Sequence, residues 1–572
     1  MSGRAFLKVF EVAFDFVDGE MRAMPRREKG ILGAPRDGKN PMLFSFSVRE
    51  GEEWQSDSSD SDWAPSDHDS PVDNGSKKAQ NKRKSSGNQE TDSESERCKR
   101  SKSMKRLSSK DRRKKPSRLD DKSSLSNNGQ KTTFESGGER YTDVWAKKMP
   151  PEILLKIFQC VCRMDGGALP FLARASKTCR LWREVSQSPV LWHVVDMSFG
   201  WVKSTDSTLV YLCPNRFKCL REIKLNGWKH LTNTGVQAIA DNCPELHTIN
   251  LSGCSKVNSI GVKVLVDRCD CLHSLDLSAT STDAVSSQSL KYLVEKVGPR
   301  LQALAVGCNT LKGFNNSLNS IIEHCSNLLC FDASNANFMS DFFSLNIERF
   351  QMGCPKLRIL RLANTRLRGS NVTNAAKDQS LGFTDMQELS LAVGARVSPV
   401  TSAGGIGIDD EFLQRMLKTS SHLKLLDLRS CCSVTNHGIQ HLPATHLQQL
   451  FISQCSIARF EGIQVIMQKW QHSLVELDLS WNIYPGASFD IAMNKIASNP
   501  QHSKLQILNL SGTSIAFPRL KSILEGCPHL KKLNLQSCRG LPRGMKKDFE
   551  GETLNRLREE IVTFGDEHDD RR

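Results

Sequence analysis

Residues 246–254 read LHTINLSGC, with apolar side chains at Leu246, Ile249 and Leu251 and a thiol at Cys254. From residue 220 onwards this phrase, L-x-x-L-x-L-x-x-C/N/T, occurs twelve times, mostly at intervals of 24 to 31 residues. A period of this length with this apolar spacing is typical of a leucine-rich repeat, which contributes one strand and one helix per unit. Because no unit can bury its own apolar face, the copies are expected to stack on one another.

The repeats predict an α/β fold, a leucine-rich-repeat solenoid of horseshoe form over residues 220–545. Such a surface usually binds other proteins. Beyond Leu541-Pro542, the stretch DFEGETLNRLREEIV predicts a short amphipathic helix. Because the terminal unit of a solenoid needs a cover for its apolar edge, we assign residues 546–572 to a C-terminal cap and tail.

The composition excludes several classes of protein. The chain has 572 residues, of which 38% are hydrophobic, and it contains no run of 18 apolar residues, so no membrane span is expected. Many of the 19 cysteines recur at matched repeat positions, which are small packing sites, and this usage indicates a reducing compartment. Close pairs such as Cys160/Cys162 lack a second pair or two histidines at ligand spacing, so neither a metal nor another cofactor is expected.

Residues 1–140 are expected to form a long disordered tail. From Gln55 to Gly75 the chain combines Ser, Asp and Pro with almost no aliphatic residues. Such a segment cannot bury enough apolar surface to offset the entropy of ordering it.

A basic segment follows at residues 97–118, with twelve Lys or Arg residues against one acid, while the whole chain carries a net charge of +15. It has three interpretations: a nuclear-import signal, a nucleic-acid contact that works by counterion release, or a solvated spacer. Binding to nucleic acid is disfavoured because the segment has no aromatic residue on which a base could stack. The candidate import signal consists of Lys110, Arg112, Arg113, Lys114 and Lys115.

Residues 143–197 have the composition of a small all-α unit. Pro150 and Pro151 suit the start of a helix, where a missing N–H is tolerated, and Glu152 is favourable in the first turn. The following apolar residues repeat at helical spacing, and the segments FLARASKTCRLWREVS and SPVLWHVV continue the pattern. About 50 residues make a marginal core, so we expect this unit to complete its core on a partner. Residues 198–219 are expected to be a linker to the repeats.

The order M-P-P-E-I-L-x-x-I-F, C-R-x-W-R and P-x-L-W resembles the F-box signature, with Met149 in place of the usual Leu. An F-box followed by cysteine-containing repeats is similar to the F-box and leucine-rich-repeat (FBXL) group of ubiquitin-ligase subunits. The resemblance implies binding to a Skp adaptor, which docks on a cullin scaffold with a RING subunit, and it implies no catalytic residue in this chain. For Trp182 and Ile157 in particular, the alternative is a place in the F-box core. The adaptor-binding residues it implies are Pro150, Pro151, Glu152, Ile153, Leu154, Ile157, Phe158, Trp182, Leu191 and Trp192.

The substrate is expected to bind the concave face, which the x positions of each L-x-x-L-x-L strand should line. Consensus residues such as Asn250, Asp276 and Asp427 are interpreted as scaffold. The candidate substrate-binding residues depart from the consensus or add positive charge nearby, which suggests an acidic protein substrate. They are Lys224, Trp228, Arg358, Arg361, Lys424, Arg429 and Phe451.

Two segments rich in Gly, Ser, Asn and Thr, Thr365 to Asp385 and Ala392 to Asp409, replace expected helices. Each is either an edge that binds a partner or a tolerated irregular loop.

Three functional hypotheses follow. The first is the substrate receptor of a cullin–RING ubiquitin ligase in the nucleus and cytoplasm, the second a nuclear repeat scaffold outside any ligase, and the third a nucleic-acid-associated protein. The chain has neither a G-x-x-x-x-G-K-[ST] loop nor an H-E-x-x-H motif. A receptor would act by holding its substrate near the ubiquitin-conjugating enzyme rather than by bond chemistry.

Deletion of residues 97–118 is expected to abolish nuclear accumulation of a fluorescently tagged protein, because it removes the compact basic cluster. Imaging of the tagged chain with and without the segment checks this, and an unchanged distribution would refute the import signal.

Overall fold

The computed structural model describes residues 149–163, 168–198, 200, 202–338, 342–379, 381–393, 408–455, 462–482 and 486–569. The expected disordered tail at 1–140 and the basic cluster from Lys110 to Lys115 lie outside these residues. None of the described helices is both long and apolar enough to cross a membrane.

The N-terminal helical unit, residues 149–198, packs around one aromatic side chain. Phe158 is fully buried, and its ring meets those of Phe171 and Trp182 edge-on at centroid distances of 4.9 and 5.0 Å. The indole N–H of Trp192 donates to the Ser186 carbonyl at 2.9 Å, which ties the end of the unit to its last helix. Its elements are α3 (Pro151–Cys162), α4 (Ala168–Ala175), α5 (Arg180–Ser186) and the 3-10 turn η1 (Pro189–Leu191).

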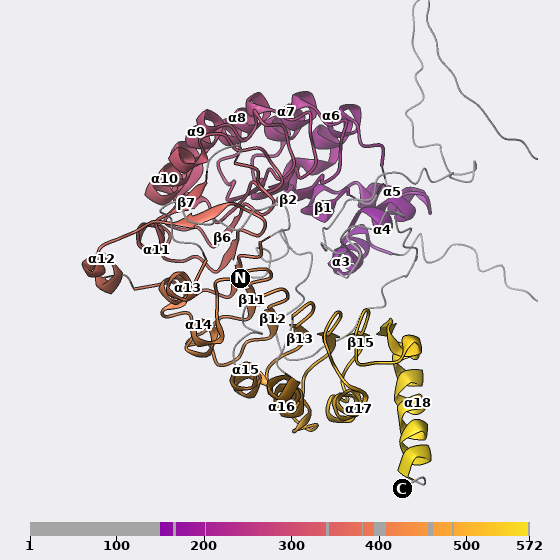
Figure 1. Cartoon of the computed structure of the whole chain (residues 1–572). Helices are drawn as coiled ribbons and strands as arrows, with labels where there is room; N and C mark the ends of the chain where they lie inside the picture. The colour runs from indigo at the N-terminus through magenta and orange to yellow at the C-terminus, as the bar shows by residue number, and fades with distance from the viewer. Residues whose placement is uncertain are drawn as a thin grey trace, which may run out of the picture. The chain divides into compact units, whose positions relative to one another are not determined.

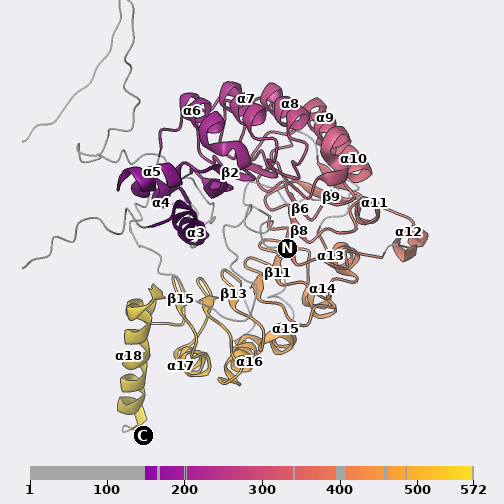
Figure 2. The same cartoon turned by 180° about the vertical axis from the view of Figure 1, so that it is seen from behind.

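The repeats build one sheet whose strand order follows the chain (Figures 1 and 2). Its strands are parallel and in register except for the last, which is antiparallel. In order they are β1 (Val194–Asp196), β2 (Glu222–Lys224), β3 (Thr248–Asn250), β4 (Ser274–Asp276), β5 (Ala303–Ala305), β6 (Cys330–Asp332), β8 (Ile359–Arg361), β10 (Glu388–Ser390), β11 (Leu425–Asp427), β12 (Gln449–Phe451), β13 (Glu476–Asp478), β14 (Ile507–Asn509), β15 (Lys532–Asn534) and β16 (Asp548–Glu550).

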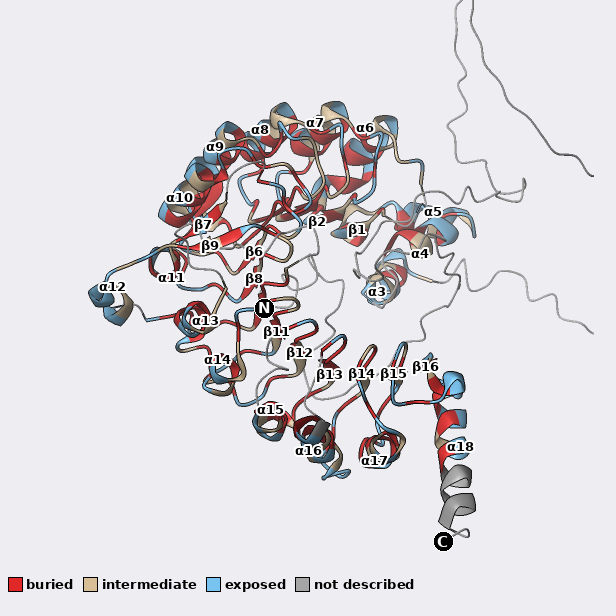
Figure 3. Cartoon of the chain, viewed as in Figure 1, coloured by how far each residue is buried: buried red, intermediate tan, exposed pale blue. Residues whose placement is uncertain are grey.

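Helices cover one side of this sheet, and the apolar core lies between the two layers (Figure 3). The middle residue of each parallel strand, such as Leu275 or Leu508, is fully buried. Side chains along a strand alternate between faces, so the first and third residues point to the side without helices, here called the open face. The helical elements are α6 (Asp206–Arg216), η2 (Phe217–Cys219), α7 (Asn233–Asn242), α8 (Ser259–Arg268), α9 (Ser287–Val297), η3 (Gly298–Arg300), α10 (Phe314–His324), α11 (Ile347–Gly353), α12 (Asn374–Gln379), α13 (Asp410–Leu417), α14 (Asn436–Gln440), α15 (Ile463–Trp470), α16 (Gly486–Ala497), α17 (Phe517–Gly526), η5 (Arg543–Met545) and α18 (Glu552–Asp569).

The ninth position of the repeat links neighbouring units. The thiol of Cys254 lies 3.2 Å from the Leu225 carbonyl of the preceding unit, and Cys455 makes the same contact with Leu428 at 2.9 Å. Asn309 and Asn482 use their amide nitrogens for the equivalent bond. These side chains are small packing residues that also donate to a buried carbonyl. This shared contact explains why either Cys or Asn can occupy the position.

The region expected to be a linker, residues 198–219, instead belongs to a repeat unit. It contains α6 and η2, and β1 pairs in parallel with β2 through Val195 and Ile223. Leu209 and Leu212 of α6 are buried, and the carboxylate of Asp206 accepts hydrogen bonds from the N–H and hydroxyl of Thr232. The unit escapes the sequence pattern because Val195 and Met197 stand where the consensus has leucines.

The C-terminal end has the helix that the sequence suggests. Leu554, Leu557 and Ile561 of α18 are buried, and the Arg558 guanidinium donates to the carbonyls of Leu524 and Cys527 at 2.8 and 3.0 Å. The helix thereby covers apolar residues and carbonyl groups that a further repeat would otherwise have covered.

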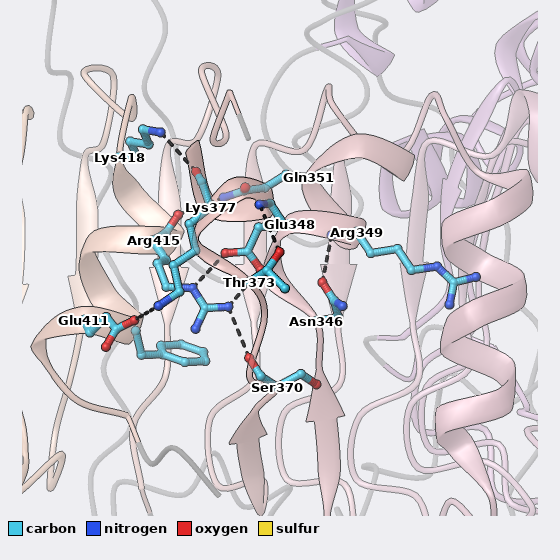
Figure 4. A network of polar contacts seen from close by, with 12 residues as sticks. Asn346, Glu348, Arg349, Gln351, Ser370, Thr373, Lys377, Glu411, Arg415 and Lys418 are labelled. Carbon is cyan, nitrogen blue, oxygen red and sulfur yellow. Dashed lines mark hydrogen bonds and ion pairs between the residues drawn. The ribbon is translucent and has the colours of Figure 1, made fainter. Parts of the chain in front are cut away.

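The middle of the sheet is irregular and is held by a buried ion pair. Short strands β7 (Phe343–Leu345) and β9 (Leu367–Gly369) form a separate two-stranded sheet. Arg415 on α13 donates two hydrogen bonds to Glu348 on α11, at 2.7 and 2.8 Å, and a third to the Ser370 carbonyl at 3.2 Å (Figure 4). Both charged side chains are at most 7% exposed. Burial alone would raise the pKa of Glu348, but the hydrogen bonds from Arg415, a backbone hydrogen bond and the positive charges of Arg415 and Lys377 together lower that pKa.

Arg415→Met is expected to destabilise the chain by about 3–5 kcal/mol, because it leaves the Glu348 carboxylate buried without its partner. Lys377→Met is the matched control: Lys377 pairs with Glu411, whose side chain is 52% exposed, so its loss should cost less than about 1 kcal/mol. Denaturant unfolding of both variants measures the difference, and equal midpoints would show that the buried pair does not stabilise this region.

Candidate protein-interaction surfaces

The first helix of the N-terminal unit leaves an apolar strip exposed. Ile153 and Ile157 are 46% and 44% exposed, and their spacing of four residues places them on the same side of α3. Pro150, Pro151 and Glu152 are also exposed at the start of the helix. Large apolar side chains exposed together on one helix face are the usual sign of a protein contact.

The other predicted adaptor-binding residues divide differently. Leu154, Phe158, Leu191 and Trp192 are at most 3% exposed and belong to the core of the unit, and Trp182 is half-buried against Phe158. For Ile157, the alternative of a place in the F-box core is wrong, because its side chain is 44% exposed. Because its side chain lies on the outer face of α3, a partner can reach it without any rearrangement.

A shallow hollow adjoins this strip. It has a volume of ≈ 280 Å³ and lies between the start of α3 and helix α5. Two of its half-buried apolar residues, Leu155 and Leu181, are absent from the predicted adaptor-binding residues. The signal that could have found them is the position of each leucine on its predicted helix. The lining residues are Pro151, Glu152, Leu155, Leu181, Glu184, Val185 and Ser188.

Trp228, a predicted substrate-binding residue, lies in the core instead. It is 2% exposed, and its indole N–H donates to the Met197 carbonyl at 2.9 Å. Counting from Leu220 places Trp228 at the ninth position of its repeat, where Cys254 stands in the next unit. The indole therefore makes the same inter-unit bond as the cysteines and cannot contact a substrate.

The predicted positive residues are largely neutralised within the chain. Arg361 donates two hydrogen bonds to Glu388, at 2.5 and 2.9 Å, and Arg429 donates two to Asp427, at 2.9 and 2.8 Å. Arg358 lies 3.6 Å from Asp385, and Lys224 lies 4.0 Å from Asp196. Burial alone would lower the pKa of Arg361, but its bonds to Glu388 raise it.

Lys424 and Phe451 are the two predicted substrate residues that remain to be placed. Lys424 is exposed and forms no ion pair among the described residues. Phe451 is half-buried on β12 with the Arg429 guanidinium 5.4 Å from its ring centroid. This cation–π contact occupies one side of the ring, so Phe451 is only in part available to a ligand.

The open face is acidic rather than basic. The expectation of an acidic substrate assumed a positively charged face, so the structure does not support it. The first and third residues of the described parallel strands include three basic residues, Lys224, Arg361 and Lys532. The same positions hold eight acidic residues, namely Asp196, Glu222, Asp276, Asp332, Glu388, Asp427, Glu476 and Asp478.

Several of these acidic side chains stabilise the turn that follows their strand. The carboxylates of Asp276, Asp332 and Asp478 accept a hydrogen bond from the backbone N–H two residues later, as Asn250 does in its own unit. The interpretation of the consensus residues as scaffold agrees with these bonds. The hydrogen bonds from Ser278 lower the pKa of Asp276, but burial has a larger effect in the opposite direction. Together with the charge of Asp332, burial raises the pKa of Asp276 to about 6.

The two irregular segments are only partly described. Residues 394–407 lie outside the described residues, whereas 365–379 contain β9 and α12. Lys377 on α12 pairs with Glu411, and Lys418 donates to the Lys377 carbonyl at 3.2 Å. These contacts attach α12 to α13, and whether the edge binds a partner stays a prediction.

The described cysteines are all free thiols, and the buried ones are poor nucleophiles. Burial raises the pKa of Cys254, Cys325 and Cys455 to about 12, so these thiols are protonated at neutral pH. Among the described residues no group of three or more His, Cys, Asp or Glu side chains could hold a metal ion.

Asp276→Asn is expected to stabilise the fold at neutral pH by on the order of 1–2 kcal/mol. The ordinary pKa of 3.8 rises to about 6 in the fold, so between these values the unfolded chain ionises first and native stability falls as pH rises. The amide keeps the acceptor for Ser278, so only the charge is lost. The gain should appear in denaturant unfolding at pH 7.5 and vanish at pH 4. Asp427→Asn, which breaks the pair with Arg429, should show no gain. A variant no more stable than the parent at pH 7.5 would contradict the raised pKa.

Comparison with known proteins places the helical unit in a family. Residues 146–198 match the family described as F-box-like. Among curated proteins of Arabidopsis thaliana, F-box protein SKIP19 is 29% identical over 167 residues, which is 28% of this chain and 53% of that protein. Putative F-box/LRR-repeat protein 9 is 28% identical over 136 residues, which is 23% of this chain and 52% of that protein. The chain thus spans about half the length of the curated relatives it matches.

Two solved structures align with this chain at low sequence identity. The crystal structure of the Rad7 and Elc1 complex in yeast aligns with a TM-score of 0.40 and 16% identity, covering 69% of this chain and 84% of that chain. The TLR13–ssRNA13 complex aligns with a TM-score of 0.35 and 22% identity, covering 61% and 44%. Both scores are low, so the description of the fold depends on the strand order and register given above. Residues 146–198 are therefore an F-box-like domain, which this chain joins to a parallel sheet of leucine-rich repeats.

Proposed function

We propose that this chain is the substrate-recognition subunit of a Skp–cullin–F-box ubiquitin ligase and recruits target proteins for ubiquitination and degradation. The observation that carries the proposal is the exposed strip of Ile153 and Ile157 on an F-box-like domain, beside a hollow that Pro151 and Leu181 help to line. A Skp-type adaptor is the partner that this domain implies, and the adaptor would link the chain to the cullin and its RING subunit.

The strip and the hollow together form a surface that suits an adaptor. The isoleucines supply apolar anchors, and the hollow can accept a side chain from the partner. Phe158 is fully buried against Phe171 and Trp182, and Trp192 packs on Phe217 of the first repeat unit, so the domain does not need the adaptor to bury its aromatic centre. Adaptor binding then covers apolar surface without refolding the unit.

In this proposal the repeats would bind the substrate, and the F-box-like domain would bind the adaptor. The chain would act by proximity, raising the effective concentration of substrate lysines near the conjugating enzyme. The thiols at the ninth repeat position, such as Cys254 and Cys455, are buried and protonated at neutral pH, so these cysteines are unsuited to the accessible thiolate that a cysteine ligase needs.

Two finer assignments belong to the same proposal. The basic cluster from Lys110 to Lys115 supports a nuclear as well as a cytoplasmic location. The segments PNRF at Pro214, GCPKLRILRL at Gly353, LLDLRSC at Leu425 and SCRGLPRGMKK at Ser537 resemble F-box and leucine-rich-repeat protein six of vertebrates.

Ile153→Asp combined with Ile157→Asp is expected to abolish co-purification of the Skp adaptor and the cullin. Each charge would be buried against the adaptor, and loss of an interface anchor typically costs about 2–4 kcal/mol. Both side chains are exposed, so thermal unfolding of the isolated variant should match that of the parent. This pair is a cleaner test than Leu154, whose substitution would damage the core.

Ile260→Asp is the matched control, since Ile260 is an isoleucine on α8 with 62% exposure, remote in sequence from the F-box-like domain. It should retain the adaptor. Full adaptor recovery by the double variant would overturn the proposed interface. Recovery of adaptor without cullin by the parent chain would instead favour a repeat scaffold outside any ligase.

A further inference from the structure

The segment between the last two strands carries a dense positive charge. Residues 539–547, RGLPRGMKK, follow β15 and lead into β16, and we call them the exit loop (Figure 3). The loop contains no acidic residue, and its basic residues are Arg539, Arg543, Lys546 and Lys547. By comparison, the stretch between β3 and α8 has one charged residue, Lys256, and the stretch between β14 and α17 has none. The charge is therefore a property of this loop and not of the repeat.

Two buried side chains hold the exit loop in place. Leu541 and Met545 are 4% and 9% exposed and belong to the apolar core. The amide of Arg539 donates to the Thr513 carbonyl of the preceding unit at 3.2 Å, and the 3-10 turn η5 forms the second half of the loop. Because the loop is already ordered, its side chains lose less conformational entropy on binding than the same residues on a mobile chain would.

The charges of the exit loop are accessible. Arg539, Arg543 and Lys547 are exposed, and Lys546 is half-buried. Among the described residues, none of these four side chains forms a hydrogen bond or an ion pair. In this respect they differ from the basic residues of the open face, which are paired within the chain.

The acidic residues that follow the loop do not neutralise it. The ammonium group of Lys532 lies 3.4 Å from the Asp548 carboxylate and 3.1 Å from that of Glu550, so both acids are engaged by a lysine outside the loop. Residues 531–550 contain six basic and two acidic residues, a balance of +4. The end of the repeat array therefore presents positive charge that the described part of the chain leaves without a partner.

We propose that the exit loop binds an acidic segment of a substrate protein, that is, a run of Asp and Glu side chains. Opposite charge steers such a segment to the loop and favours it over other partners. Side chains three residues apart in a 3-10 turn lie on the same side, which places Arg543 and Lys546 together. The inference rests on the proposed role of the repeats as the substrate-binding surface.

The exit loop is distinct from the surface on which an acidic substrate was expected from the sequence. That expectation concerned the open face, whose basic residues are paired, whereas the loop lies beyond the carboxyl end of β15. Four cations distributed along nine residues also match a row of carboxylates better than the single dianion of one phosphate group.

A nucleic acid is a less suitable partner for this loop. No aromatic residue lies between Arg539 and Lys547, so a base has nothing on which to stack. A polyanion that binds by counterion release would find more cations in residues 97–118, which hold twelve Lys or Arg residues.

The chain's own acidic segment, from Gln55 to Gly75, is a rival occupant. It contains six aspartates and no Lys or Arg. Residues 97–118 are closer to it in sequence and carry more positive charge than the exit loop, so they compete for it at a higher effective concentration. We therefore favour a separate protein as the partner of the loop.

The test compares two variants of equal charge in the full chain. The loop variant combines Arg539→Gln, Arg543→Gln, Lys546→Gln and Lys547→Gln. The control variant removes the same charge from exposed lysines in separate repeats, through Lys229→Gln, Lys256→Gln, Lys312→Gln and Lys504→Gln. Both variants also lack residues 97–118, whose basic side chains would otherwise bind an acidic probe. Thermal unfolding of the two should agree, because none of the eight side chains is buried.

The probe is a fluorescein-labelled dodecapeptide of alternating Glu and Gly, and its binding is measured by fluorescence anisotropy. It should bind the control variant at least tenfold more tightly than the loop variant, and a Gln-Gly peptide should bind neither. Equal affinity of the acidic peptide for both variants would overturn the proposal. An oligothymidine of equal charge should show a smaller loss than the peptide, and a larger loss would assign the loop to nucleic acid instead.

Two further measurements separate the alternatives. Carbodiimide cross-linking of the intact chain joins lysines to carboxylates in contact, and it should yield no major product between Lys546 or Lys547 and residues 55–75. Such a product would make the chain's own segment the occupant and the substrate assignment wrong. The loop variant should still recover the Skp adaptor, so a failed peptide result with intact adaptor binding would refute the loop and leave the receptor proposal standing.

Discussion

In-register pairing of three-residue strands is the constraint on which the rest of this structure depends. A strand such as β4 is too short to be stable alone, and it persists because β3 and β5 satisfy its backbone groups on both sides. Equivalent residues then stack in rows, so each position of the repeat has one environment. The second strand residue enters the core, and the ninth position meets a carbonyl of the preceding unit, as Cys254 meets Leu225.

Insertions between the paired strands are held by side chains. Between β6 and β10 the chain adds β7, β9 and α12, while β6, β8 and β10 themselves still pair in register. The Arg415–Glu348 pair joins α11 to α13 across this region, and it is buried, so removal of one partner leaves a charge without compensation. The ends of the array are completed in a comparable way, by β1 and α6 at one end and by α18 at the other.

The two candidate interaction surfaces differ in their physical character. The F-box-like domain offers exposed apolar side chains beside a hollow, which suits a permanent partner that covers them. The open face offers carboxylates over small residues, and its basic side chains are already paired within the chain. Charge on such a face favours partners of opposite sign and affects selectivity more than total affinity.

Much of this architecture could be predicted from the sequence. The repeat period predicted parallel strands, each with a buried apolar residue in the middle. It did so because the apolar residue that recurs in every unit must be buried between neighbouring units. The capping helix at 552–569 followed from its amphipathic pattern. The unit formed by β1 and α6 could not be recognised, since Val195 and Met197 replace the consensus leucines. The prediction that Trp228 contacts a substrate was wrong for a related reason: it was chosen because it departs from the repeat consensus, although its register assigns it to the core.

The sequence by itself determined the order of the units, the inward row of leucines and the similarity of residues 146–198 to an F-box. Only the tertiary structure decided which side chains are free to bind. Ile157 is exposed while Leu154 is buried, and Arg361 forms an ion pair with Glu388 on the next strand. Periodicity is a local property of the chain, whereas exposure and charge pairing also depend on neighbours that are distant in sequence, such as Arg361 and Glu388, which are 27 residues apart.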